Sequence, residues 1–124
     1  MSKLLKSLED RIAVESSEYV RAELRAKRAA CLARIGDFDE ARKEIASIRE
    51  TFGDGRSGRV TVLVMIAEGL VLHFESLSGL AIDRVMRALM LAQAGRDQEL
   101  IALTSAWKAY FDFERSDFET AARS

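Results

Sequence analysis

The chain has 124 residues, of which 48% are hydrophobic and 31% are charged, and its formal net charge is −1. These values exclude a disordered chain, and the balanced charge excludes a global field that attracts nucleic acid or an anionic membrane. The single cysteine, Cys31, excludes an internal disulfide framework. The absence of proline predicts an all-α chain, and the length fits one domain over residues 1–124. Because the N-terminus does not resemble a secretion signal, the expected location is the cytoplasm.

Two helices are expected before the first glycine. Residues 2–14 form an amphipathic pattern, and Ser16 and Ser17 supply cap chemistry for a second helix over residues 18–35. The second helix is rich in alanine, so neighbouring helices can approach it closely. No histidine stands at a helix-neighbour position of Cys31, which is therefore interpreted as a small buried hydrophobe.

Gly36 is expected to end the second helix, because glycine adopts the left-handed conformation after a helix without steric cost. Asp37 then caps a third helix over residues 38–51, and Glu40 completes the spacing of a capping box. So short a connection predicts that the two helices pack as an antiparallel hairpin.

The segment GDGRSGR, residues 53–59, is typical of a loop, and its only anion-binding feature is Ser57 before a helix N-terminus.

Residues 60–74, VTVLVMIAEGLVLHF, are apolar on all sides of a helix, which predicts a buried position in the middle of a bundle. The run is shorter than a membrane span and contains Glu68 and His73. A turn at residues 76–79, a helix over 80–94 and a helix over 98–113 capped by Asp97 follow. Ser116 is expected to start a further helix, which brings the total to about seven.

One turn motif recurs along the chain. The segment GDFDEA at residues 36–41 is similar to SDFETA at residues 116–121, with a looser copy at residues 78–81, and the spacing of about 40 residues is typical of helical-hairpin repeats. The residues assigned to the repeated turn are Gly36, Asp37, Phe38, Ala41, Ser116, Phe118 and Ala121.

The continuous unit from Ala22 to Gly53 resembles a tetratricopeptide repeat, and the matching positions are Ala29, Leu32, Gly36, Phe38, Ala41 and Ile45. Arg25 and Arg28 stand where that family prefers Trp and Leu, and the spacing exceeds its usual period of about 34. The chain is therefore most similar to the divergent, longer repeats of bacterial regulatory and signalling proteins. This resemblance implies a short right-handed solenoid of stacked antiparallel hairpins. A stack with an open end also implies a longer parent array or a homodimer.

Glu68 is the carboxylate least suited to its surroundings, because burying a lone charge in an apolar helix is costly. We expect it to pair with Arg84 or Arg87, while a ligand-binding or catalytic role remains the alternative. His73 is the only histidine and is expected at the solvated end of its helix. A metal site needs several converging ligands, so no metal, cofactor or catalytic residue is assigned.

The candidate interaction surface combines a basic stripe with an aromatic group, and its members are Arg21, Arg25, Arg28, Trp107, Tyr110 and Phe111. The stripe carries too little charge for a typical nucleic-acid interface. Together with the resemblance, these residues predict a non-enzymatic module that binds another protein or itself. The alternatives are a small effector lodged between the helices, a helical-repeat RNA-binding module, or an enzyme with a pocket of converging ionisable groups.

Overall fold

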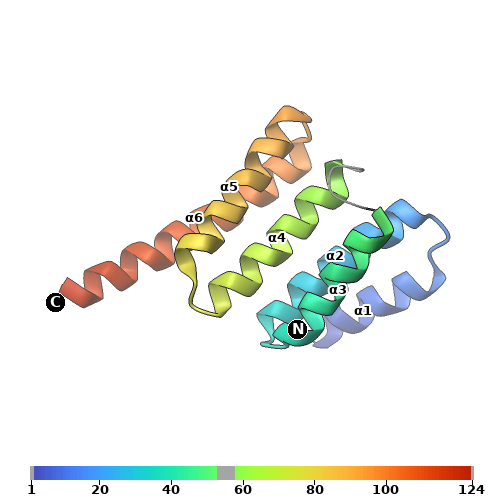
Figure 1. The fold of residues 1–124 in the computed structure, drawn as a ribbon, viewed down its shortest axis with the longest axis horizontal. Coiled ribbons are helices and arrows are strands. Elements are labelled where there is room, and N and C mark those ends of the chain that lie inside the picture. Colours follow the sequence, from blue (N-terminus) through green and yellow to red (C-terminus); the bar gives the residue numbers. More distant parts are fainter. Residues whose placement is uncertain (1, 53–57, 124) are drawn as a thin grey trace.

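The computed structural model describes residues 2–52 and 58–123, with side chains described for 3–52 and 58–114 (Figure 1). Within these ranges the chain forms six helices and no strand, which confirms the all-α prediction. The helices are α1 (Ser2–Val14), α2 (Glu18–Arg34), α3 (Phe38–Phe52), α4 (Gly58–Phe74), α5 (Ser78–Ala94) and α6 (Gln98–Arg123).

The predicted helix start at Ser116 is wrong, because α6 continues without a break from Gln98 to Arg123. Neither glycine nor proline interrupts this stretch, and a serine alone does not stop a helix whose neighbours all favour helical geometry. The seventh helix of the predicted count is therefore the second half of α6. The side chains of Phe118 and Ala121 lie outside the described residues.

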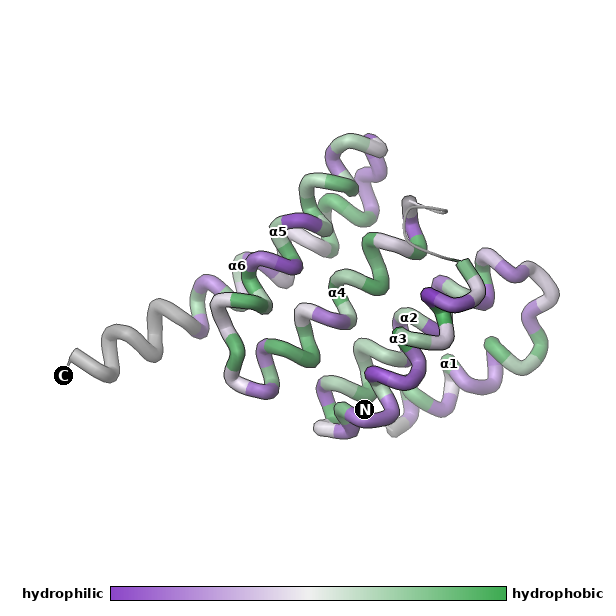
Figure 2. Tube along the Cα trace, in the orientation of Figure 1, coloured by the Kyte–Doolittle hydropathy of each residue, from purple (hydrophilic) through white to green (hydrophobic). Residues whose placement is uncertain are grey.

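Helix α4 lies in the middle of the fold, as the sequence predicted. It packs against α2, α3, α5 and α6, and only α1 among the described helices makes no close backbone contact with it (Figure 1). Hydrophobic residues predominate along its length in Figure 2. Nine of its residues are buried: Val60, Val62, Leu63, Val64, Ile66, Ala67, Gly69, Leu70 and Val71. The loop prediction for residues 53–57 lies outside the described residues.

Three helix connections share one geometry. Each has a left-handed residue just after the helix, and these residues are Gly36 (φ 89°), Ser76 (φ 68°) and Arg96 (φ 55°). In each connection the next N–H donates to the carbonyl oxygen five residues earlier, over 2.9 Å from Asp37, 2.8 Å from Leu77 and 3.1 Å from Asp97. This is the hydrogen bond of a Schellman motif. The repeated turn is therefore real, but its copies follow α2, α4 and α5, and none lies at Ser116.

Polar side chains start three of the helices where the sequence predicted caps. Ser17 Oγ accepts a hydrogen bond from the N–H of Val20 over 3.3 Å. Asp37 Oδ1 accepts from the N–H of Glu40 over 3.3 Å. Asp97 Oδ1 accepts from the N–H of Leu100 over 3.2 Å. Each bond satisfies one of the backbone donors that a helix N-terminus leaves free.

Small residues let the paired helices approach closely. Ala29 of α2 and Ala41 of α3 are fully buried in the core, and about 40 residues later Gly69 of α4 and Ala81 of α5 occupy the equivalent places. A Cβ added at Gly69 would lie 2.7 Å from Cγ2 of Val85. Any larger residue at this position would therefore displace Val85 from the contact between α4 and α5.

The α1–α2 interface has a small apolar cluster of its own. Leu8, Leu24 and Cys31 are buried together there, with Leu5 and Ile12 packed against them. Burial raises the pKa of the Cys31 thiol, which keeps it protonated at neutral pH. Cys31 thus lies where its interpretation as a small hydrophobe placed it, and it holds α1 against α2.

Replacing Gly69 by alanine should destabilise the fold. The added methyl group displaces the buried Val85, and overpacking of this kind costs more than the helix propensity that alanine restores, so Gly69→Ala should lower the free energy of unfolding by about 1–2 kcal/mol. Urea denaturation followed by circular dichroism measures this change. Gly79→Ala is the matched control, because nothing lies within 4 Å of a Cβ at Gly79. Equal stability of the Gly69→Ala protein and the parent would contradict the close contact.

Candidate functional site

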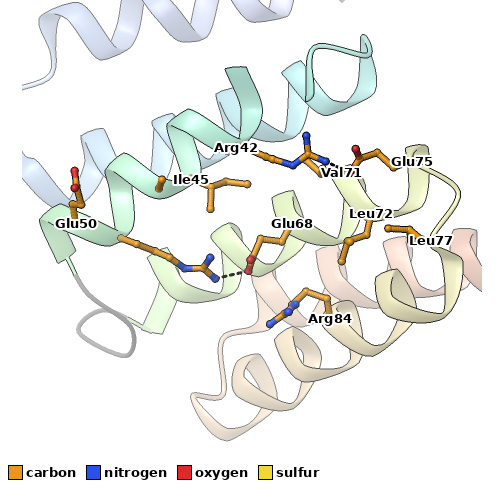
Figure 3. Close-up of a pocket in the computed structure, with 11 residues that line it drawn as sticks. Arg42, Ile45, Glu50, Glu68, Val71, Leu72, Glu75, Leu77 and Arg84 are labelled. Atoms are coloured by element: carbon orange, nitrogen blue, oxygen red, sulfur yellow. Dashed lines mark hydrogen bonds and ion pairs between the residues drawn. The ribbon is translucent and has the colours of Figure 1, made fainter. Parts of the chain in front are cut away.

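An open groove lies over α4, between α3 and α5. Its volume is about 720 Å³. The groove forms because α3 and α5 both pack on α4 but make no close backbone contact with each other in the described residues. Figure 3 shows its lining, which consists of Arg42, Ile45, Ala46, Arg49, Glu50, Glu68, Val71, Leu72, Glu75, Leu77 and Arg84.

Two ion pairs along this groove join α3 to Glu68 of α4 and to Glu75, the residue that follows α4. Arg49 Nη2 donates to Glu68 Oε1 over 2.5 Å, and Arg42 pairs with Glu75. The predicted partners of Glu68 are therefore wrong, since Glu68 reaches α3 rather than α5. Arg87 instead pairs with Asp83 within α5.

Arg84 is the arginine of the groove that lacks a partner in the described part of the chain. Its Nε atom is buried and forms no hydrogen bond, and no ion pair of the guanidinium is present there. Glu50 also borders the groove, but it is exposed and points away from Arg84 in Figure 3. Arg84 therefore brings a positive charge to the groove that the two ion pairs leave uncompensated.

A second, smaller cleft lies between α1, α2, α4 and α6, with a volume of about 250 Å³. Its walls are apolar apart from two cationic side chains, Lys27 and Arg34, and none of the acidic residues whose side chains are described lines it. Trp107 forms one wall, and the guanidinium carbon of Arg34 lies 5.6 Å from the centre of the Trp107 ring. This distance is typical of a cation–π contact.

The arginines of the predicted basic stripe are engaged within the fold. Arg21 donates to the carbonyl oxygen of Glu15. Arg25 Nε lies 2.5 Å from Glu44 Oε1, and Arg28 Nη1 lies 3.0 Å from Glu44 Oε2. Arg28 Nε also lies 2.9 Å from Glu9 Oε2, so the stripe ties α2 to α1 and α3. Lys27 and Arg34, which line the small cleft, were not predicted as part of the interaction surface. No local sequence pattern distinguishes them from the other cations of α2.

The predicted aromatic residues lie in different environments. Trp107 is half-buried at the small cleft, Tyr110 is 38% exposed, and Phe111 is 1% exposed and belongs to the core. The His73 ring stacks on Phe111 with ring centres 4.4 Å apart. Burial lowers the pKa of His73. His73 lies in the last turn of α4, as expected, but its side chain is half-buried among aromatic rings rather than fully solvated.

Arg59, in the first turn of α4, joins α4 to α2 and to the start of α6 through three carboxylates. Its Nε lies 2.5 Å from Glu23 of α2, Nη1 lies 2.6 Å from Asp97, which caps α6, and Nη2 lies 2.9 Å from Glu99 of α6. These bonds raise the pKa of Arg59. The pKa of Asp97 is lowered, mainly because its carboxylate accepts a hydrogen bond from the Leu100 N–H. The hydrogen bond and positive charge of Arg59 lower it further. The rest of the predicted anion loop, residues 53–57, lies outside the described residues.

The described residues contain neither a metal-binding cluster nor a helix suited to cross a membrane. No group of three or more His, Cys, Asp or Glu side chains is arranged to hold a metal ion in this part of the chain. None of the described helices combines the length and the apolar character that crossing a membrane requires.

Comparisons of the chain with protein-family models, with curated protein sequences and with solved structures give no match. The tetratricopeptide resemblance therefore remains a prediction from the sequence. A binding role is therefore inferred from the residues that line the two clefts.

The Arg59 cluster predicts a pH dependence of stability that Asp97→Asn should reduce. Because the folded-state pKa of Asp97 is lowered from its usual 3.8, its ionised form stabilises the fold above that pH. This contribution is lost as the pH falls through the folded-state pKa. Asparagine still caps a helix, so the substitution removes mainly the charge.

Urea midpoints measured from pH 7 to about pH 2.5 test this assignment. The Asp97→Asn midpoint should lie below that of the parent at pH 7, and the two should converge at the acidic end. Asp10→Asn, at an exposed carboxylate inside α1, is the control and should leave the pH 7 midpoint unchanged. A constant offset between the Asp97→Asn protein and the parent at every pH would contradict the role of the charge.

Proposed function

We propose that the chain is a non-enzymatic module that binds another protein, built as a short right-handed stack of tetratricopeptide-like hairpins in a bacterial regulatory or signalling protein. Two observations support the stack. The α2–α3 and α4–α5 hairpins share the same Schellman turn and the same placement of small residues between their helices. In addition, α2 packs directly against α4, as neighbouring units of a helical repeat do.

The observation that carries the binding role is the small cleft beside Trp107. Its volume, about 250 Å³, is below the range of about 300–1,000 Å³ typical of small-molecule sites, but it accommodates a large apolar side chain. Tryptophan and arginine, which occur together here, are the residues most enriched among the dominant contacts of protein interfaces.

The charges around this cleft indicate what the partner carries. Lys27 and Arg34 are exposed at its border, and neither forms an ion pair with a carboxylate in the described part of the chain. A segment that inserts an apolar side chain and places acidic residues on either side of it complements both features. We therefore assign the partner as an acidic, amphipathic segment of another protein.

Selection from a library of displayed peptides tests this function and reveals the partner's sequence pattern in the same experiment. The parent chain should enrich peptides that combine a large apolar residue with nearby Asp or Glu. Trp107 is the only tryptophan, so binding of each synthesised peptide should change its fluorescence directly. A Lys27→Glu, Arg34→Glu double variant should bind at least about tenfold more weakly, because the cleft then repels acidic residues.

Reversing two cations that lie away from the cleft provides the matched control. Lys43 and Arg87 are exposed on α3 and α5, so Lys43→Glu, Arg87→Glu changes the net charge equally and should preserve binding. Selection that enriches no peptide family, or enriched peptides that bind both double variants equally well, would contradict the proposed cleft.

A further inference from the structure

The groove between α3 and α5 differs from the Trp107 cleft in size and in charge. Its volume, about 720 Å³, falls within the range of small-molecule sites. Apolar side chains from two helices and a connection supply much of its wall, with Ile45 from α3, Val71 and Leu72 from α4, and Leu77 just before α5. Such a wall binds the hydrocarbon part of a ligand by removing it from water.

The charged side chains of the groove define the polar part of that ligand. The Arg49–Glu68 and Arg42–Glu75 pairs are complete within the protein. Arg84 alone among the arginines of the groove lacks an ion-pair partner in the described residues, and its buried Nε has no acceptor there. An anion bound in the groove therefore gains a charge-assisted hydrogen bond from this guanidinium without breaking an existing pair.

The neighbouring carboxylates limit the charge that this anion can carry. Glu68 and Glu75 line the same groove, and each would repel a second negative charge placed beside Arg84. A carboxylate carries one negative charge and has two acceptor oxygens, which match adjacent N–H groups of a guanidinium. A phosphate dianion fits these surroundings less well.

We propose that the α3–α5 groove binds a small organic monocarboxylate with an apolar body. The carboxylate accepts hydrogen bonds from Arg84, and the apolar body packs on the wall formed by Ile45, Val71, Leu72 and Leu77. This site is separate from the cleft beside Trp107 and does not depend on the protein-binding role assigned there.

Calorimetric titration of the whole chain with 4-phenylbutyrate tests the site, because this probe joins one carboxylate to an apolar body. The parent should bind it, and the uncharged analogue 4-phenylbutanamide should bind at least tenfold more weakly. Arg84→Gln should weaken 4-phenylbutyrate binding by at least tenfold. Arg87→Gln removes an exposed arginine of the same helix and should leave the affinity unchanged. Methyl NMR of the parent should show shifts at Ile45 and Leu77.

Several outcomes would overturn this assignment. Absence of 4-phenylbutyrate binding excludes the site, and equal affinity for the acid and the amide excludes recognition of the carboxylate. Inorganic phosphate binding more tightly than 4-phenylbutyrate excludes the monocarboxylate class. The comparison of acid with amide uses only the parent chain, so it remains decisive even if Arg84→Gln alters the fold, which circular dichroism would detect.

Discussion

The need to cover α4 on all sides determines the rest of the structure. A helix with apolar residues around its whole circumference is stable only when neighbours remove each side from water. Four helices do so, as the hairpin partner α5, the preceding helices α2 and α3, and α6 all pack against α4. These neighbours do not close completely around it. In the described residues α3 makes no close backbone contact with α5, and α2 makes none with α6. Both clefts lie where these pairs remain apart.

Charged side chains link neighbouring helices beside both clefts. Arg49 extends from α3 to Glu68 of α4, Arg42 extends from α3 to Glu75 just after α4, and Arg59 connects the first turn of α4 to both α2 and α6. The long arginine side chain spans the gap between helices while its methylene groups stay against apolar surface. The same arrangement leaves Arg84 without a carboxylate, because the acidic residues of the groove turn toward α3. Arg84 is therefore available to a ligand.

Features set by local sequence were predictable, and features set by tertiary contacts were not. The caps at Ser17, Asp37 and Asp97 depend on residues within one helical turn, so the sequence located them. The sequence placed a turn at residues 76–79, but it did not predict the left-handed conformation of Ser76, which serine rarely adopts. The Arg49 partner of Glu68 and the unpaired Arg84 depend on which helices adjoin α4, which periodicity does not specify.

Native-state hydrogen exchange measured amide by amide tests the central position of α4 most directly. A helix buried on all sides opens only when the whole domain unfolds, so its amides exchange with the global free energy of unfolding. The buried α4 residues from Val62 to Leu70 should be the slowest in the chain, and their exchange free energies should equal the value from urea denaturation. Faster exchange in this segment than in α2 or α5 would contradict the central position of α4.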